Sequence, residues 1–293
     1  MKARILSGMD AIIIANPASG RGDMDNLKRC AESLRERCDE VEIWPTERPE
    51  HATELATLAG AYLVVAAGGD GTVNEVINGL HADATLGVLP LGTANVLARE
   101  LGIPLDAGKA CRRIVEGETI RMDLGVATDG DGVERKFSCM AGIGFDANVI
   151  QEVPARMKRD LGVMAFALTA FKVLAVRDLP WIRIQNGGEH MSQFAIIANG
   201  HYYGGDYKAS DSASLTNGEL DVIMVEKVSK LLRPDIFGRI LAKKPLSKDA
   251  TRFAATELEA TSDERVPVQL DGEIWSHLPM SFRVEPASLK VVK

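Results

Sequence analysis

The chain has 293 residues, of which 46% are hydrophobic and 26% charged, and its formal net charge at pH 7 is −7. This length favours two domains that can each bury a core, and the composition excludes wholesale disorder. The acidic balance argues against a nucleic-acid partner bound through a basic face, because such binding depends on cationic side chains that release phosphate counterions.

The cysteines and the apolar segments give no sign of a zinc site, a disulfide framework or a membrane span. The four cysteines form no CxxC pair and show no ligand spacing with the five histidines. The apolar run Ala11–Ala15 is too short for a secretory signal, and the longest run, Leu161–Val176, is interrupted by Lys172. We therefore expect a cytoplasmic, reducing location.

The first 125 residues alternate short apolar segments with segments of helical periodicity. The apolar segments, which are typical of buried strands, are Ala11–Ala15, Val41–Trp44, Tyr62–Ala67 and Leu86–Leu89. Helical spacing lies between them, as at His51–Leu58 and Asn74–Leu80. This alternation indicates βαβ units and a parallel sheet buried on both faces, so we predict an α/β domain over residues 1–125.

From about Arg121 onward, strand-like segments follow one another. They are Arg121–Thr128, Lys136–Ile143, Trp181–Gln185, Phe194–Asn199, Leu220–Val225, Val266–Leu270 and Met280–Val284. Helical patterns interrupt them only at about Ala155–Val176 and Ser229–Ala242. This order predicts an all-β, sandwich-type domain over residues 126–293, with the last strand as a candidate to return to the first domain.

Three glycine-rich segments, Asn16–Gly22, Gly68–Thr72 and Pro90–Asn95, follow predicted strands of the α/β domain, where such folds bind ligands. Glycine lets the backbone approach an anion and turn several N–H groups toward it. Each segment alone is better explained as a tight strand-to-helix turn, but three at successive strand ends favour a nucleotide site. None contains a Walker A lysine, so backbone amides and a metal ion would have to hold the phosphates.

The segment Gly68–Leu80, GGDGTVNEVINGL, resembles the signature of the diacylglycerol kinase catalytic family, which includes sphingosine kinases and bacterial lipid kinases. The resemblance continues in family order through Asn16–Gly20, Thr46, Pro90–Asn95, Arg99, Asp123–Gly125, Gly142–Asp146 and Leu270–Glu273. It implies an N-terminal α/β domain like that of NAD kinases, which binds the nucleotide, followed by a β-sandwich that takes the lipid. The active site would lie in the inter-domain cleft. The two domains agree with those indicated by the strand and helix pattern.

The resemblance also implies which residues bind ATP and which act on the acceptor hydroxyl. The expected ATP-binding residues are Asn16, Pro17, Ala18, Ser19, Gly20, Thr46, Gly69, Asp70, Gly71, Thr72, Val73, Asn74, Glu75 and Thr93. Glu273 is expected to accept the proton of the lipid hydroxyl, and Asp70 to be required for turnover. Considered without the family, Asp271–Glu273 is an ordinary hairpin turn, because Asp-Gly is a strong turn signal.

Magnesium is implied at two places. Asp123 resembles the family aspartate that joins Asp70 in an aspartate–water–magnesium network, and a solvated aspartate at a strand end is the alternative. A structural magnesium is implied on a loop before a late strand, with ligands Ser214, Asn217 and Glu219. Asn217 stands where relatives often have aspartate, and an amide oxygen lacks the carboxylate charge, so we expect weaker binding there.

These observations predict an ATP-dependent lipid kinase that uses Mg²⁺ and phosphorylates a hydroxyl of diacylglycerol or a related lipid at the inner face of a membrane. Leu161–Val176, preceded by Arg156, Lys158 and Arg159, is either an acyl-chain or interfacial helix or a helix of the core. A homodimer stays open. The alternatives are a soluble kinase related to NAD kinase, which shares Gly-Gly-Asp-Gly-Thr, and a catalytically silent nucleotide- or lipid-binding module.

Overall fold

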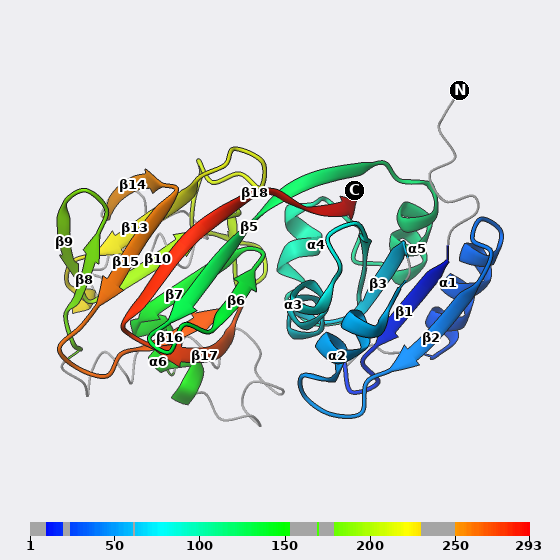
Figure 1. Cartoon of the computed structure of the whole chain (residues 1–293), viewed down its shortest axis with the longest axis horizontal. Coiled ribbons are helices and arrows are strands. Elements are labelled where there is room, and N and C mark those ends of the chain that lie inside the picture. The colour runs from blue at the N-terminus through cyan, green and yellow to red at the C-terminus, as the bar shows by residue number, and fades with distance from the viewer. Residues whose placement is uncertain (1–9, 20–23, 61, 153–168, 170–178, 230–249) are drawn as a thin grey trace. The chain divides into compact units, whose positions relative to one another are not determined.

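The computed structural model in Figure 1 describes residues 10–19, 24–60, 62–152, 169, 179–229 and 250–293. The chain divides into two compact units. One, here called the α/β unit, comprises Met1–Leu124, Gly204–Asp206 and Pro286–Lys293. The other, the sandwich unit, comprises Gly125–Tyr203 and Tyr207–Glu285. The strands β5 (Thr119–Asp129) and β18 (Met280–Val292) each contribute residues to both units.

A parallel sheet forms the centre of the α/β unit, with the strand order β2-β1-β3-β4-β18. Its first four strands are β1 (Ala11–Ala15), β2 (Val41–Pro45), β3 (Leu63–Gly68) and β4 (Thr85–Pro90). Every residue of β1, β3 and β4 is buried. Strands buried on both faces are continuously apolar, which is why the sequence predicted them well.

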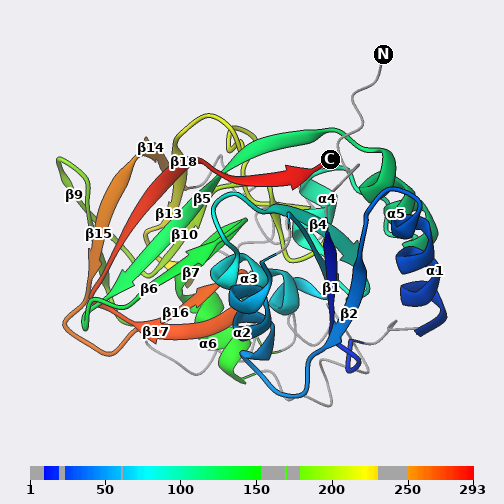
Figure 2. The same cartoon turned by 45° about the vertical axis from the view of Figure 1, so that its right-hand side comes forward.

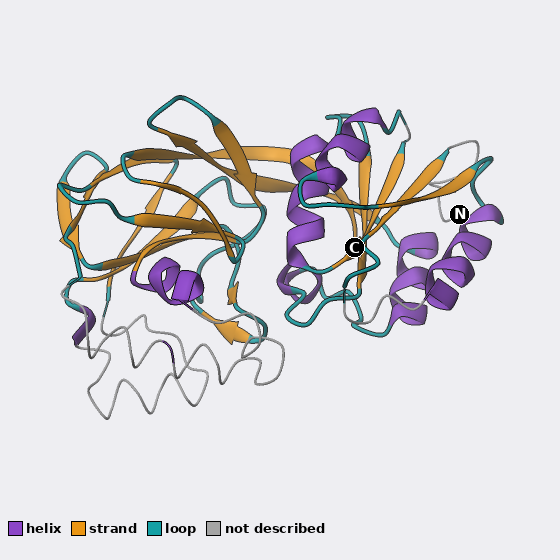
Figure 3. Ribbon diagram, turned by 90° about the horizontal axis from the view of Figure 1, so that it is seen from below, coloured by secondary structure: helices purple, strands orange, loops and turns teal. Residues whose placement is uncertain are grey.

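Helices cover both sides of this sheet (Figure 3). They are α1 (Met24–Arg35), α2 (His51–Leu58), α3 (Asp70–Gly79), α4 (Val96–Glu100) and α5 (Ala107–Glu116). Helix α1 packs on α5, and α2 packs on α3. A Cβ atom at Gly79 would lie 2.1 Å from the carbonyl oxygen of Thr53, so glycine is what permits the close approach of α3 to α2.

Two sheets with antiparallel pairing make up the sandwich unit (Figures 1 and 2). The first has the order β14-β13-β10-β7-β16-β17, with bounds Thr251–Ala255, Leu220–Val225, Phe194–Ala198, Met140–Gly144, Pro267–Leu270 and Glu273–His277. In the second, β18 pairs with β5 and with β15 (Glu257–Thr261), β15 with β8 (Ile182–Gln185), β8 with β9 (Glu189–Ser192), and β5 with β6 (Glu134–Phe137). The remaining elements are α6 (Phe145–Glu152) and the short pair β11 (Tyr202–Tyr203) and β12 (Tyr207–Lys208).

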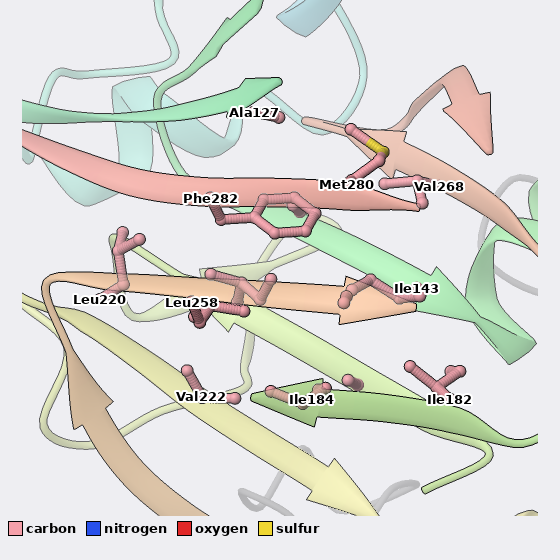
Figure 4. Close-up of a cluster of buried hydrophobic side chains, with 14 of the residues drawn as sticks. Ala127, Ile143, Ile182, Ile184, Leu220, Val222, Leu258, Val268, Met280 and Phe282 are labelled. Carbon is pink, nitrogen blue, oxygen red and sulfur yellow. The ribbon is translucent and has the colours of Figure 1, made fainter. Parts of the chain in front are cut away.

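The side chains between these two sheets form one hydrophobic core (Figure 4). Ile143, Leu220, Val222 and Val268 come from one sheet, and Ala127, Ile182, Ile184, Leu258, Met280 and Phe282 from the other. Gly125 also has a packing role, because a Cβ atom there would lie 2.0 Å from Cζ of the Phe137 ring. Close packing of this kind makes the unit sensitive to single side-chain truncations.

The structure differs from the sequence-based expectations at two places. The single strand predicted at Lys136–Ile143 is wrong: β6 ends at Phe137 and β7 begins at Met140, because the N–H groups of Ser138 and Cys139 bond to the carboxylate of Asp271. Helix α3 begins at Asp70, one residue after its N-cap Gly69, and not near Asn74. The helical patterns expected at about residues 155–176 and 229–242 lie almost entirely outside the described residues. Among the described residues, no helix is long and apolar enough to cross a membrane.

Phe282→Ala should lower the free energy of unfolding by about 3–5 kcal/mol, because the ring is 1% exposed and its loss leaves a cavity between the sheets. Val133→Ala is the control, since Val133 is 55% exposed and should cost less than about 0.5 kcal/mol. Urea denaturation followed by circular dichroism measures both values. A cost for Phe282→Ala no larger than that of the control would contradict this description of the core.

Candidate functional site

The predicted nucleotide-binding segments meet at one edge of the parallel sheet. Parallel strands end at the same edge, so the residues after β1, β2, β3 and β4 are neighbours there. Backbone hydrogen bonds connect them: Asn16 N–H donates to Ala67, Thr46 N–H to Ala15, and Leu91 N–H to Gly68. The structure therefore brings Asn16, Thr46, Gly69 and Thr93 into one region of the α/β unit.

The first loop is ordered by the side chain of Asn16. Its Nδ2 donates to Thr72 Oγ1 at 3.2 Å, and its Oδ1 accepts the Ala18 N–H at 2.9 Å. The Ser19 hydroxyl closes the turn by donating to the Asn16 carbonyl at 2.7 Å. Pro17 and Ala18 are exposed, whereas Gly20 lies outside the described residues.

Asp70 joins the second glycine-rich loop to the third. Its Oδ2 accepts the Asn95 N–H at 2.9 Å and its Oδ1 accepts the Val96 N–H at 2.6 Å, so the carboxylate caps the first turn of α4. A Cβ atom at Gly92 would lie 2.5 Å from the Cα of Gly69, so glycine is required where these loops touch. The immediate contacts of Asp70 therefore hold the shape of the loops.

The remaining predicted ATP-binding residues differ in how much surface they offer. Thr72, Val73 and Asn74 are 5%, 5% and 3% exposed, whereas Gly71 is half-buried and Thr93 is exposed. The Glu75 carboxylate accepts the Ala52 N–H at 3.1 Å, which places it at the N-terminus of α2. At the start of α3, the backbone around Gly69 and Gly71 is the part that a ligand could approach most closely.

Asp123 is 3% exposed and lies in the part of β5 that belongs to the α/β unit. Its Oδ1 accepts the Ala287 N–H at 2.7 Å, while Arg121 Nη1 donates to the Ala287 carbonyl at 3.3 Å. Ala287 has a φ of 49°, an unfavourable value for alanine. Asp123 therefore binds the N–H and Arg121 the carbonyl of Ala287, a residue of β18 with strained backbone, and Asp123 is not a solvated strand-end residue.

The predicted metal ligands Ser214, Asn217 and Glu219 comprise one carboxylate and two neutral oxygen groups. Among the described residues, no group of three or more His, Cys, Asp or Glu is arranged to hold a metal ion. On the loop before β13, Asn217 Oδ1 accepts the Glu219 N–H at 3.2 Å and the Ser214 hydroxyl lies 3.4 Å from that of Thr216. This loop offers oxygen atoms, which suit magnesium, but Glu219 supplies its only predicted carboxylate ligand and is exposed.

In the sandwich unit, Asp271 and Gly272 form the two-residue hairpin turn between β16 and β17. Their φ values are 48° and 93°, and Leu270 pairs with Glu273 across the turn, as in a type I′ hairpin. The Asp271 carboxylate accepts the N–H groups of Ser138, Cys139 and Met140 and the Ser138 hydroxyl, all at 2.7–3.0 Å. These four bonds fix the turn against the connection between β6 and β7.

Glu273, the predicted proton acceptor, is the first residue of β17 and its side chain is 52% exposed. Its Oε2 lies 3.9 Å from Nη2 of Arg135 on β6, whose side chain is 16% exposed. The backbone of Glu273 is thus fixed by the turn while its carboxylate faces solvent. Sequence reasoning missed Arg135, because nothing in the local pattern of β6 predicts that it approaches a residue more than 130 positions away.

A buried polar network connects Asp146 to this turn. Its Oδ2 accepts from Gln269 Nε2 at 3.0 Å and from the Tyr203 hydroxyl at 3.1 Å, and its Oδ1 accepts the Ala147 N–H at 2.7 Å. Gln269 Oε1 in turn accepts the Gly272 N–H at 2.7 Å. Burial raises the pKa of Asp146 from 3.8 to about 6, although its hydrogen bonds oppose that change.

The raised pKa of Asp146 predicts how the free energy of unfolding changes with pH. The folded protein binds this proton more tightly than the unfolded chain, so the contribution of Asp146 to stability is greatest below pH 3.8 and is lost as the pH rises through about 6. Relative to Asp146→Asn, the wild type should lose up to roughly 3 kcal/mol of stability between these pH values. Urea unfolding of both proteins across this pH range measures the difference. A difference that does not change with pH would contradict the buried, titrating carboxylate.

Comparison with known proteins agrees with both units. Residues 10–127 match the diacylglycerol kinase catalytic domain, and residues 139–293 match the YegS C-terminal NAD kinase beta sandwich-like domain. The chain is 30% identical over 292 residues to a diacylglycerol kinase of Mycobacterium tuberculosis, covering 96% of this chain and 94% of that protein. It is 32% identical over 244 residues to a probable YegS-like lipid kinase of Chromohalobacter salexigens, covering 80% and 76% of the two chains.

The fold is shared with solved structures. A diacylglycerol kinase of Bacillus anthracis has a TM-score of 0.79 and 25% identity, with 97% of this chain and 96% of that chain covered. The predicted fold class, an α/β domain with a parallel sheet followed by a β-sandwich, is confirmed, and kinase chemistry implies ATP as phosphate donor. The chain belongs to the diacylglycerol kinase catalytic family and is a lipid kinase.

Proposed function

We propose that this lipid kinase transfers the γ-phosphate of Mg²⁺-ATP to the hydroxyl of diacylglycerol or a closely related lipid, with Glu273 as the proton acceptor. Several relatives are named diacylglycerol kinase, which supports the acceptor class. The observation that carries the proposal is the placement of Glu273, a half-exposed carboxylate directly after a turn fixed by Asp271 and Gly272. A general base must be both accessible and held in place.

In this reaction the protein forms no covalent intermediate with the phosphoryl group. The lipid oxygen attacks the γ-phosphorus in line, a new O–P bond forms as the bond to ADP breaks, and the hydroxyl proton passes to the Glu273 carboxylate. Most of the catalysis then comes from positioning and from compensating phosphate charge. A rigid turn before Glu273 suits this demand, because a displaced base loses hydrogen-bond reach of the hydroxyl.

We assign ATP binding to the sheet edge where the loops after β1, β3 and β4 meet. The backbone N–H groups around Gly69 and Gly71 and the N-terminus of α3 suit an anionic ligand, and none of the three loops contains a lysine. Mg²⁺ enters with ATP as part of the substrate. In this proposal Asp70 and Asp123 act on that Mg²⁺ through water, while their direct contacts keep Asn95 and Ala287 in place.

The acceptor lipid is taken from a membrane surface, which makes the enzyme a peripheral protein of the inner face in this proposal. The segment that suggested interfacial docking, Leu161–Val176, lies outside the described residues apart from Thr169. A homodimer stays a prediction, and no nucleic-acid partner is proposed.

Glu273→Gln should reduce phosphate transfer at least about 100-fold, because the amide keeps the shape of the side chain but cannot accept the hydroxyl proton. The assay uses γ-labelled Mg²⁺-ATP and mixed micelles of diacylglycerol, phosphatidylglycerol or a sphingoid base, with NAD as a parallel soluble acceptor. Glu264→Gln is the matched control, since Glu264 is an exposed glutamate of the same unit.

Each outcome bears on one part of the proposal. Labelled diacylglycerol from the wild type but not from Glu273→Gln supports the whole proposal. Label in another lipid would change the assigned acceptor and leave the rest of the proposal in place. Label in NAD alone would show a soluble kinase related to NAD kinase, and no label from folded protein would favour a silent binding module. Full activity of Glu273→Gln would remove the assigned base.

A further inference from the structure

We propose that Asp146 is a positioning residue for Glu273: its carboxylate holds the Gln269 amide in the orientation that accepts the Gly272 N–H, and so fixes the turn from which Glu273 projects. The inference rests on the proposed role of Glu273 as the base. It adds two residues to the machinery, Asp146 on α6 and Gln269 on β16, neither of which contacts the acceptor in this assignment.

The direction of the hydrogen bonds determines the orientation of Gln269. The Gly272 N–H can only donate, so the atom that faces it at 2.7 Å must be the amide oxygen, Oε1. The amide nitrogen then faces Asp146 Oδ2 at 3.0 Å, where a carboxylate accepts from it. Gln269 is 1% exposed, so water cannot replace either partner. An ionised Asp146 thus selects one of the two amide orientations, the one that the turn needs.

The hydrogen bond between Gln269 and Asp146 depends on the absence of a side chain at Gly142. Gly142 pairs with Gln269 across β7 and β16. A Cβ atom at Gly142 would lie 1.8 Å from Asp146 Oδ2 and 2.5 Å from Gln269 Nε2. Glycine at this position is therefore required for the carboxylate and the amide to meet, which shows that the contact is built into the strand pairing.

Gly272 and Asp271 are held by separate partners. Asp271 is anchored to the connection between β6 and β7, whereas the Gly272 N–H is anchored through Gln269. The peptide that joins Asp271 to Gly272 sets the direction in which the chain enters β17. Loss of the Gln269 bond should therefore move Glu273 without releasing the whole hairpin.

Among the described residues, few ionisable groups lie on the strands that pack against α6. Helix α6 packs against β7, β10, β16 and β17. Strand β17 carries Glu273 and His277, and Tyr203 of β11 faces Asp146 directly. Burial and the neighbouring Asp146 raise the pKa of Tyr203 well above its usual value, so this hydroxyl stays neutral and donates. Because burial brings the pKa of Asp146 to about 6, protonation should weaken the network in mildly acidic solution.

The test compares kcat for diacylglycerol phosphorylation by the wild type and Asp146→Asn from pH 5 to 8, at saturating Mg²⁺-ATP and lipid. The introduced amide has the shape of a protonated carboxyl group. We expect the ratio of the two kcat values to be roughly 10- to 100-fold at pH 8 and to fall toward about 1 at pH 5. Protonation of ATP at low pH affects both enzymes alike, so it cancels in the ratio of the two kcat values. KM for the lipid should change less than about twofold, because Asp146 contributes no acceptor contact.

Asn148→Ala is the matched control, because Asn148 is also a buried polar residue of α6, 6% exposed, and its amide bonds to the Gly144 carbonyl and not to Gln269. It should lower thermal stability while leaving the pH profile of kcat unchanged. A fall of kcat in this variant equal to that of Asp146→Asn would reduce the effect to general loosening of α6 and overturn the proposal.

Gln269→Met provides a second route if Asp146→Asn does not fold. It keeps the length of the side chain and removes both hydrogen bonds, so it should reproduce the loss of kcat. Where both single variants fold, the double variant should lose no more than either, since the residues act as one unit. Losses that multiply, or a ratio of kcat values that stays constant with pH, would overturn the positioning role. A wild type that phosphorylates no lipid would instead refute the proposed function.

Discussion

The hydrogen bonds of one carboxylate, that of Asp271, are the constraint on which the candidate active site of the sandwich unit depends. Four donors from Ser138–Met140 converge on it, so the carboxylate satisfies the N–H groups of the backbone between β6 and β7. The same bonds hold Asp271 at a φ of 48°, a conformation that non-glycine residues rarely adopt. The break between β6 and β7 and the fixed position of Asp271 in the turn therefore depend on the same carboxylate.

The α/β unit uses the same physical device at its own loops. Asp70 caps α4 by accepting the N–H groups of Asn95 and Val96, and Glu75 accepts a backbone N–H at the start of α2. Buried or half-buried N–H groups are costly when unpaired, and a carboxylate satisfies two of them with charge-assisted bonds. Of the acidic residues in the family signature, Asp70 thus shapes the glycine-rich loops and Glu75 the start of α2.

The sequence predicted those parts of the fold that depend on local pattern. Strand β1 lies at the predicted residues because all five are apolar, and the parallel sheet followed from continuous apolar runs. The strand predicted at Lys136–Ile143 failed because its interruption depends on Asp271, which is more than 130 residues away. Gln269 and Arg135 were missed for the same reason: their roles come from partners on other strands, and no local periodicity reports such pairs.

Burying the carboxylate of Asp146 costs folding free energy, and the hydrogen bonds that it makes fix the turn before Glu273. A carboxylate 4% exposed is harder to keep ionised than one in water, and a neutral or apolar side chain would avoid that penalty. Only an acceptor-rich group, however, can receive Gln269 Nε2, the Tyr203 hydroxyl and the Ala147 N–H together. An asparagine must turn either its oxygen or its NH₂ group toward these donors, and one contact then becomes donor against donor. The ionised form is therefore the state that satisfies the whole network, and it fixes the turn before Glu273 at the expense of some folding stability.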